Sequence, residues 1–194
     1  MSSDRELVLA TRNEHKLREF ERLLGGTTLH PLPAGAPQPE ETGDTFAENA
    51  LIKARAAVGV TGRTSIADDS GVEAEALGGR PGVRSARYAG EDATDAENLA
   101  KLRAEAPPGS RLRYVCVIAY VGADGSEHLF EGTCTGTLAG EARGERGFGY
   151  DPVFVPDDDV AGGRTMAELS DEEKDEISHR GRAARKLLDW LAGR

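Results

Sequence analysis

Two adjacent carboxylates, Asp68 and Asp69, follow a short apolar run inside the stretch Ser65–Gly82 and stand directly before Ser70. Carboxylates this close repel each other and lose hydration, which is easiest to explain if a cation or a proton occupies the site. We interpret them as an acidic pair at a strand end, in a turn that does chemistry. The alternative is an ordinary solvated loop, because Asp-Asp-Ser-Gly is also a common turn composition.

A second candidate site lies near the N-terminus, where Thr11 and Arg12 end the apolar strand expected at residues 7–10. Asn13 can cap a helix that continues to about Leu24, with Lys16 in its first turn. The start of such a helix offers unpaired N–H groups and a positive dipole end to an anion. Many α/β proteins have such turns and only some bind phosphate, but the two cations favour an anion site here.

A second helix begins after Thr45, which forms a capping box with Glu48. Asn49 and Lys53 lie one turn apart on it and project together. Because this helix leads directly into the strand that carries Asp69, one interpretation is that both side chains face the same cleft as Asp69. The alternative is a solvated pair, as on most helices.

The loop 144–150 alternates glycine with Phe148 and Tyr150, and Pro152 is expected to hold the preceding Asp151 in an extended conformation. Two aromatic residues in a glycine-rich loop suggest a platform for a flat ligand. The alternative is that both rings fold back to cover the sheet.

The last helix is expected to start at Ser170, with Glu173 completing the cap, and to carry Lys174. The run 178–181 is unusual inside this helix, because it ends in Gly181 and a glycine inside a helix costs about 1 kcal/mol relative to alanine. We therefore expect a close approach of another group near Gly181.

Composition excludes several classes of function. The chain has 194 residues and a formal net charge of −10, which argues against a nucleic-acid binder that needs a basic face. An acidic protein can still bind a small polyphosphate if a divalent metal and local cations supply positive charge. We expect Cys116 and Cys134 to be reduced packing residues. No membrane span or export signal is recognisable, so a cytoplasmic location is expected.

The predicted elements alternate between strands and helices, which indicates an α/β protein. Further strands are expected at residues 114–121 and 128–138, joined as a hairpin, and a further helix starts after Thr94 and ends near residue 103. The length fits one domain over residues 1–194, with two lobes as an option.

Taken in order, these segments resemble the inosine triphosphate pyrophosphatase family, whose members hydrolyse dITP, ITP and XTP. The resemblance covers most of the chain and rests on these segments in a fixed order: LATRNEHK (9–16), EETGDTFAENA (40–50), KARA (53–56), IADDSG (66–71), ALGGRPG (76–82), SARYAG (85–90), GFGYDPVF (147–154) and SHRG (178–181).

The resemblance implies a mixed, elongated sheet flanked by helices, two lobes with a central substrate cleft, Mg²⁺ dependence and a homodimer. It makes Asp69 the catalytic carboxylate and a metal ligand, with Glu40 as the other metal carboxylate and its neighbour Glu41 as the alternative. Arg12 replaces a glycine of the family's phosphate-binding motif. The implied substrate contacts are Thr11, Arg12, Asn13, Glu14, His15, Lys16, Ser70, Phe148, Gly149, Tyr150, Asp151, Lys174, His179 and Arg180.

The implied reaction is hydrolysis of a purine nucleoside triphosphate such as ITP, dITP or XTP to the monophosphate and pyrophosphate. Two alternatives stand beside it. One is a related pyrophosphatase acting on other nucleotides, such as modified pyrimidines; the segments 148–151 and 179–180 favour the first activity over this one. The other is a nucleotide-binding regulator without hydrolysis, which would not need the acidic residues at positions 40, 41, 68 and 69.

Overall fold

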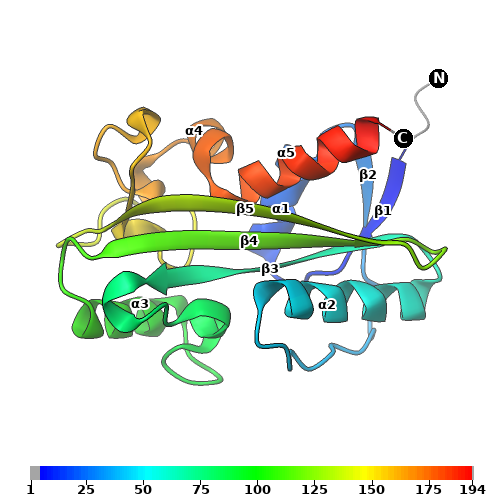
Figure 1. Ribbon diagram of the computed structural model, residues 1–194, viewed down its shortest axis with the longest axis horizontal. Coiled ribbons are helices and arrows are strands. Elements are labelled where there is room, and N and C mark those ends of the chain that lie inside the picture. The colour runs from blue at the N-terminus through cyan, green and yellow to red at the C-terminus, as the bar shows by residue number, and fades with distance from the viewer. Residues whose placement is uncertain (1–4, 194) are drawn as a thin grey trace. The chain divides into compact units, whose positions relative to one another are not determined.

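The computed structural model describes residues 5–193, and the six strands found there form one sheet in the order β2-β1-β3-β4-β5-β6 (Figure 1). β1 runs parallel to β2 and to β3, whereas β6 runs antiparallel to β5. The sheet is therefore mixed, as predicted. The strand bounds are β1 Arg5–Leu9, β2 Thr27–Pro31, β3 Ser65–Ala74, β4 Arg111–Val121, β5 Glu127–Leu138 and β6 Phe154–Pro156.

The helices begin where the capping residues predicted. The side chain of Asn13 accepts hydrogen bonds from two backbone N–H groups of the first helix, and Thr45, Thr94 and Ser170 each form a complete capping box. Such caps satisfy the N–H groups that a helix start leaves open. The helix bounds are α1 Glu14–Leu23, α2 Phe46–Thr61, α3 Asp95–Glu105, α4 Asp171–Ile177 and α5 His179–Ala192.

The chain divides into two compact units that share β3, β4, β5 and α5. Within the described residues, the first unit runs to Asp69 and takes in Cys116–Glu131 and the segment from Ala183 onward. The second unit consists of Ser70–Val115 and Gly132–Arg182. Asp69 and Ser70, which are neighbours in the chain, thus belong to different units.

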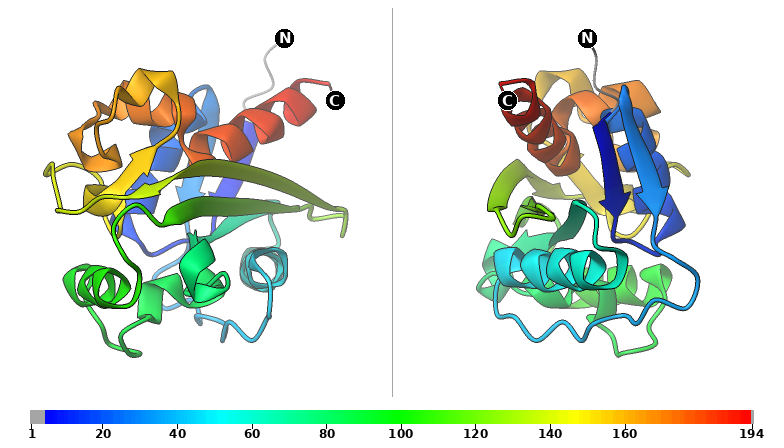
Figure 2. Two further views of the ribbon diagram at one scale, coloured as in Figure 1. Left: turned by 60° about the vertical axis from the view of Figure 1, so that its left-hand side comes forward. Right: turned by 90° about the vertical axis from the view of Figure 1, so that its right-hand side faces the viewer.

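In the first unit the sheet is covered on both faces. Cys116, Ile118 and Tyr120 alternate along β4 and pack in one core with Phe20 of α1 and Leu187 of α5. Helix α2 lies along the other face (Figures 1 and 2), and its small side chains at positions 50, 54 and 57 are fully buried. Small residues let this helix approach the sheet closely.

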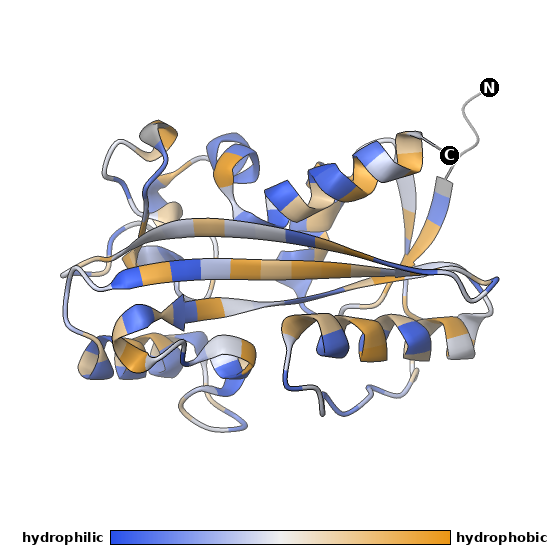
Figure 3. Ribbon diagram, viewed as in Figure 1, coloured by the Kyte–Doolittle hydropathy of each residue, from blue (hydrophilic) through white to orange (hydrophobic). Residues whose placement is uncertain are grey.

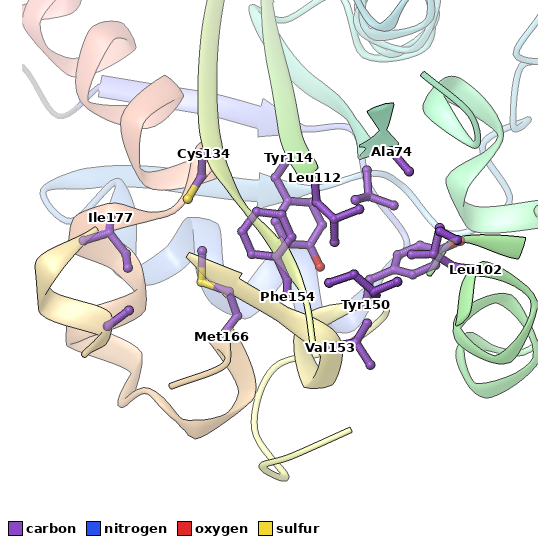
Figure 4. Close-up of a cluster of buried hydrophobic side chains, with 14 of the residues drawn as sticks. Ala74, Leu102, Leu112, Tyr114, Cys134, Tyr150, Val153, Phe154, Met166 and Ile177 are labelled. Carbon is purple, nitrogen blue, oxygen red and sulfur yellow. The ribbon is translucent and has the colours of Figure 1, made fainter. Parts of the chain in front are cut away.

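In the second unit the core is richer in aromatic rings. Figure 4 shows Tyr114 of β4 stacked with Phe154 of β6, with ring centroids 4.2 Å apart. Leu102 of α3, Ile177 of α4 and Met166, which precedes α4, belong to the same buried cluster. Aromatic stacking contributes about 0.5–1.5 kcal/mol beyond the buried area, so this core anchors the loops that carry the second set of candidate residues.

Strand β4 is the strand expected at residues 114–121, and it is covered on both faces. Figure 3 shows its middle as almost continuously hydrophobic, and from Tyr114 to Val121 every residue is buried. Only Arg111 and Arg113 near its start are exposed. Burial on both faces explains why the apolar run does not alternate.

One expectation about the strands was wrong, and one strand was not predicted. The acidic pair does not end its strand, because β3 is ten residues long and continues through Asp68 and Asp69 to Ala74. Gly71 is therefore a buried strand residue and not a turn. The strand β2 was not predicted, since Thr27–Pro31 is short and is followed by a proline- and glycine-rich loop.

The C-terminal helical segment consists of two helices. Ser178, with an extended backbone (φ −68°, ψ 156°), separates α4 from α5. The predicted close approach at Gly181 is confirmed, since a Cβ atom there would lie 2.0 Å from the carbonyl oxygen of Asp175.

Both cysteines are free and buried, as expected. Among residues 5–193, every helix is too short or too polar to serve as a membrane span.

Candidate active site

The two adjacent carboxylates point to opposite faces of β3, because side chains alternate along a strand. Asp68 lies on the face of Ile66, and its Oδ2 is 3.8 Å from Sγ of Cys116. Asp69 lies on the other face, where Nδ2 of Asn49 on α2 is 3.4 Å from its Oδ2. Each carboxylate therefore meets a different helix, which reduces the repulsion inferred from their adjacency.

On the first face, Lys16 of α1 neutralises Asp68. Its Nζ lies 3.0 Å from Oδ2 and 3.1 Å from Oδ1 of the carboxylate. The Asp68 side chain is 1% exposed and that of Lys16 is 15% exposed. The acidic strand thus meets the cationic start of α1 within the first unit.

On the second face, Lys53 of α2 bridges two carboxylates. Its Nζ lies 2.9 Å from Oδ1 of Asp69 and 2.8 Å from Oε1 of Glu41. The N–H group of Gly43 donates to Oδ1 of Asn49 at 2.8 Å, which turns the amide Nδ2 toward Asp69. The expectation that Asn49 and Lys53 face Asp69 is confirmed.

We call Lys16, Glu41, Lys53, Asp68 and Asp69 the acid–lysine cluster. Burial raises the pKa of Asp69 above the ordinary value of an aspartate, and the positive charges of Lys53 and Lys16 only partly offset this. Burial lowers the pKa of Lys53, but the surrounding carboxylates of Asp69, Asp68 and Glu41 raise it by more, so its pKa lies above the ordinary value. The cluster therefore combines a charged lysine with a carboxylate that is more basic than usual.

The carboxylate donors near Asp69 fit a hard cation. Mg²⁺ keeps several waters and is held by one or two carboxylates together with substrate phosphates. Asp69 and Glu41 direct oxygens at one point, which Lys53 Nζ contacts, whereas Glu40 is exposed. Within residues 5–193 there is no group of three or more His, Cys, Asp or Glu side chains arranged as a metal site, so a cation here would draw further ligands from water and phosphate.

The start of α1 is arranged differently from the simple expectation of open N–H groups. Oδ1 of Asn13 accepts from the N–H groups of His15 and Lys16 at 2.9 and 3.1 Å. Thr11 Oγ1 accepts from the N–H group of Asn13 at 3.2 Å. The side chain of Arg12 donates to the carbonyl of Ala36 and so ties this turn to the following loop.

Of the remaining predicted contacts at this turn, Glu14 and His15 are exposed on the first turn of α1. Lys16 is the predicted residue of segment 11–16 that reaches the acidic strand. An anion at this helix start would therefore meet Lys16, the dipole of α1 and N–H groups that Asn13 at present occupies.

A second cluster lies in the second unit and is built around Phe148. Nζ of Lys174 is 5.3 Å from the centre of its ring, and Cζ of Arg180 is 5.7 Å from the same centre. Asp151 accepts from Lys174 Nζ at 2.7 Å and from the N–H group of Phe148 at 2.9 Å. We call Phe148, Asp151, Lys174, His179 and Arg180 the aromatic–cation cluster.

The aromatic residues of the loop have separate roles. Phe148 is half-buried, whereas Tyr150 is 6% exposed and packs in the core, where its hydroxyl donates to the carbonyl of Ser85 at 2.7 Å. Folding back onto the sheet is thus the correct interpretation for Tyr150. The N–H group of Gly149 donates to Asp95 Oδ2 at 2.8 Å, which fixes the loop between them.

Gly147 is the position where this loop requires glycine. Its φ is +71°, and a Cβ atom there would lie 2.1 Å from Oδ2 of Asp151. The Asp151 carboxylate can therefore approach the loop backbone closely.

His179 and Arg180 begin α5 and are both buried. Nη2 of Arg180 donates to Oγ of Ser70 at 2.8 Å, so two predicted substrate contacts far apart in sequence touch each other. The imidazole of His179 stacks on the ring of Tyr114, with centroids 4.4 Å apart and planes 12° apart.

Two residues that contact the aromatic–cation cluster or its loop carried little signal in the sequence. Tyr114 reads there as one member of an apolar strand, yet its hydroxyl donates to Asp151 Oδ1 at 3.1 Å. Asp95 reads as the first residue of a capped helix, yet it holds the loop at Gly149. Both act through contacts that only the fold creates.

The sequence matches known proteins over nearly its whole length. The sequence model of the Ham1 family matches residues 7–190. A dITP/XTP pyrophosphatase of Symbiobacterium thermophilum is 51% identical over 193 residues, covering 97% of this chain and 96% of that protein. A dITP/XTP pyrophosphatase of Geobacillus kaustophilus is 50% identical over 192 residues, covering 94% of this chain and 92% of that protein.

Solved structures show the same fold. The HAM1 protein of Coxiella burnetii superposes with a TM-score of 0.85 at 42% identity, covering 98% of this chain and 100% of that one. The Ham1 protein of Staphylococcus aureus superposes with a TM-score of 0.83 at 40% identity, covering 97% of this chain and 99% of that one. The chain therefore belongs to the Ham1 family, which confirms the resemblance drawn from its motifs.

Proposed function

We propose that this protein is a nucleoside triphosphate pyrophosphatase that hydrolyses dITP, ITP and XTP to the monophosphate and pyrophosphate. The observation that carries the proposal is the buried Asp69, which shares Lys53 with Glu41 while its neighbour Asp68 binds Lys16 at the start of α1. Relatives about half identical to this chain bear the name dITP/XTP pyrophosphatase, which supports the same activity here.

Asp69 is the proposed general base. A water molecule that donates to its carboxylate attacks the α-phosphorus; the water proton passes to Asp69 and the bond to the β-phosphate oxygen breaks. The raised pKa of Asp69, caused mainly by burial, makes it a better proton acceptor than an exposed aspartate. Lys53, 2.9 Å from Oδ1, holds the carboxylate in place and adds positive charge near the reacting phosphate.

The substrate carries about four negative charges, which an acidic protein must neutralise locally. We propose that Lys16 and the start of α1 bind the β- and γ-phosphates and so stabilise pyrophosphate as it leaves. Thr11, Arg12, Asn13, Glu14 and His15 form the turn around that end of the substrate. Of these, Arg12 acts by fixing the turn, since its side chain is bonded to the carbonyl of Ala36.

We propose Mg²⁺ as the cofactor, held by Asp69 and by Glu41 in preference to Glu40. Glu41 shares Lys53 with Asp69, whereas Glu40 is exposed. A bound Mg²⁺ neutralises phosphate charge and lowers the pKa of a coordinated water. Loss of activity with a chelator and its recovery with Mg²⁺ test this assignment.

The aromatic–cation cluster is proposed to recognise the base. Phe148 offers a ring for stacking, which contributes about 1–3 kcal/mol per base in single-strand binders. His179, Arg180 and Lys174 present N–H groups as donors to the 6-keto oxygen of hypoxanthine or xanthine.

Adenine has an amino group at position 6 of the ring and would face those donors with another donor. Sites built on such hydrogen bonds discriminate by about 10⁴–10⁵ because a mismatch leaves buried polar groups unpaired. The preference for keto purines therefore follows from the donor set of this cluster.

Pyrophosphate release from ITP, XTP, GTP, ATP and dUTP, with and without Mg²⁺, tests the function. Release from ITP and XTP well above that from ATP and dUTP supports it. A preference for dUTP would favour the pyrimidine alternative, and binding without hydrolysis would favour a regulator. Hydrolysis of ITP in ¹⁸O-labelled water identifies the phosphorus that the water attacks. Attack at the α-phosphorus places the label in IMP and leaves pyrophosphate unlabelled.

We also propose a homodimer in the cytoplasm, on the strength of the family resemblance. Light scattering coupled to size-exclusion chromatography tests the dimer: a mass near twice that of the 20.6 kDa chain supports it and the monomer mass contradicts it.

A further inference from the structure

Tyr114 joins several members of the aromatic–cation cluster although it belongs to none of the segments that suggested a site. It lies on β4 in the second unit and is 5% exposed. Its ring stacks on Phe154 at 4.2 Å, as Figure 4 shows, and on His179 at 4.4 Å. Both partner rings lie nearly parallel to the Tyr114 ring, at interplanar angles of 22° for Phe154 and 12° for His179. The Tyr114 ring therefore sets the plane of the imidazole.

The hydroxyl of Tyr114 makes a separate contact. It donates to Oδ1 of Asp151 at 3.1 Å, while Oδ2 of the same carboxylate accepts from Lys174 Nζ at 2.7 Å and from the N–H group of Phe148 at 2.9 Å. Three donors thus fix one carboxylate whose residue is 3% exposed. Rotation of Asp151 would break contacts to both Lys174 and Phe148.

The hydroxyl remains a donor under all ordinary assay conditions. Burial, followed by the nearby charge of Asp151, raises the pKa of Tyr114 well above the ordinary value of a tyrosine. Its two roles are separable, because phenylalanine would keep the stacked ring and lose only the hydroxyl.

We propose that Tyr114 is a positioning residue for base recognition: its ring holds His179 and its hydroxyl holds Asp151, and through Asp151 the Lys174 and Phe148 contacts to the base. This inference rests on the proposed function, which it deepens by naming what orients the recognising groups. It assigns to the core of the second unit a share of the selectivity for keto purines.

The test compares Tyr114→Phe, Tyr114→Leu and the wild type with ITP and ATP. Tyr114→Phe removes one hydrogen bond to the Asp151 carboxylate and should raise the KM for ITP about tenfold with little change in kcat. Tyr114→Leu also removes the stacking surface, so the KM should rise further and the preference for ITP over ATP should narrow. A purely structural role would instead lower the folded fraction and hence kcat, with KM unchanged.

Tyr120→Phe is the matched control. Tyr120 lies on the same strand, is buried to a similar degree, and packs against Trp190 in the first unit at 4.9 Å. The substitution removes the same atom from the same strand and should leave KM for ITP unchanged. Thermal unfolding of all variants shows whether each is folded at the assay temperature.

Nuclear magnetic resonance gives a readout independent of turnover. The imidazole protons of His179 should be shifted upfield by the Tyr114 ring in the wild type and in Tyr114→Phe, and should lose this shift in Tyr114→Leu. His128, which packs on Trp190 at 4.2 Å, serves as the internal control. Titration with ITP should move the His179 signals in the wild type and move them less in Tyr114→Leu.

The outcomes separate this inference from the proposed function. If the wild type releases no pyrophosphate from ITP, the function fails, while the His179 signals and the ITP titration still decide whether Tyr114 positions the cluster. If the wild type is active but all three proteins share one KM for ITP and the same ITP/ATP preference, the inference is overturned. Unchanged His179 signals in a folded Tyr114→Leu variant would overturn it as well.

Discussion

The ammonium group of Lys16 lies 3.0 Å from Oδ2 of Asp68, while the next residue in the chain, Asp69, pairs with Lys53 from another helix. Consecutive residues on β3 point to opposite faces, so two helices each supply one lysine to one carboxylate. The acidic pair is therefore tolerated inside a buried strand because each charge has its own partner. This arrangement makes specific predictions about stability and about activity.

Lys16→Met should destabilise the protein. Removing one partner of a buried ion pair leaves an unpaired charge, which costs about 3–5 kcal/mol when both groups are fully buried. Lys16 is 15% exposed, so we expect a smaller loss of about 2 kcal/mol, measured by urea unfolding. Adding Asp68→Asn should restore most of the loss, and Arg18→Met, an exposed change on the same helix, should have little effect. A double variant no more stable than Lys16→Met would contradict the pairing.

Glu41→Gln should weaken activity and Glu40→Gln should not. Glu41 contacts Lys53 beside Asp69, whereas Glu40 is exposed. Loss of one of two carboxylates should raise the Mg²⁺ concentration needed for half-maximal rate by about tenfold or more. The measurement is a Mg²⁺ titration of pyrophosphate release from ITP for both variants. The opposite ranking would return the metal role to Glu40.

Two glycine substitutions should change stability in opposite directions. At Gly181 an added Cβ would meet the backbone carbonyl of Asp175 at 2.0 Å, so Gly181→Ala should cost about 1–3 kcal/mol as overpacking does. At Gly59 in α2 an added Cβ has no atom within 4 Å, so Gly59→Ala should stabilise by about 0.5–1 kcal/mol. Urea unfolding of both variants checks the contrast. An unchanged free energy of unfolding in Gly181→Ala would contradict the close packing at this position.

How far the sequence predicts this molecule depends on which contacts are local. The helix caps and the α2 face with Lys53 depend on residues a few positions apart, and the expectations built on them were confirmed. The extension of β3 through its carboxylates depends on partners from α1 and α2, so local composition suggested a turn where the fold has a strand. Tyr114 could not be singled out, because its stacking on His179 joins residues 65 positions apart (179 − 114).

Stability should depend on acid pH through Glu173. Hydrogen bonds from Arg164, and then from the backbone at Ser170, lower the pKa of Glu173 to about 2. A lowered pKa in the folded state means that the ionised form stabilises the fold above the ordinary pKa of glutamate, about 4.3. That contribution is lost as the pH falls from there toward about 2.

Thermal unfolding of the wild type and Glu173→Gln across this pH range checks the effect. The wild type should be the more stable at pH 7, and the difference should shrink steadily as the pH falls below that of an ordinary glutamate. A gap that stays constant with pH would mean that Glu173 does not titrate in this way.

The most direct test of the central claim is the turnover of ITP by Asp69→Asn, measured together with the affinity of the same variant for ITP. If Asp69 accepts the proton of the attacking water, kcat should fall by about 10³-fold while ITP still binds with nearly wild-type affinity. A folded Asp69→Asn variant that releases pyrophosphate from ITP at the wild-type rate would contradict the account.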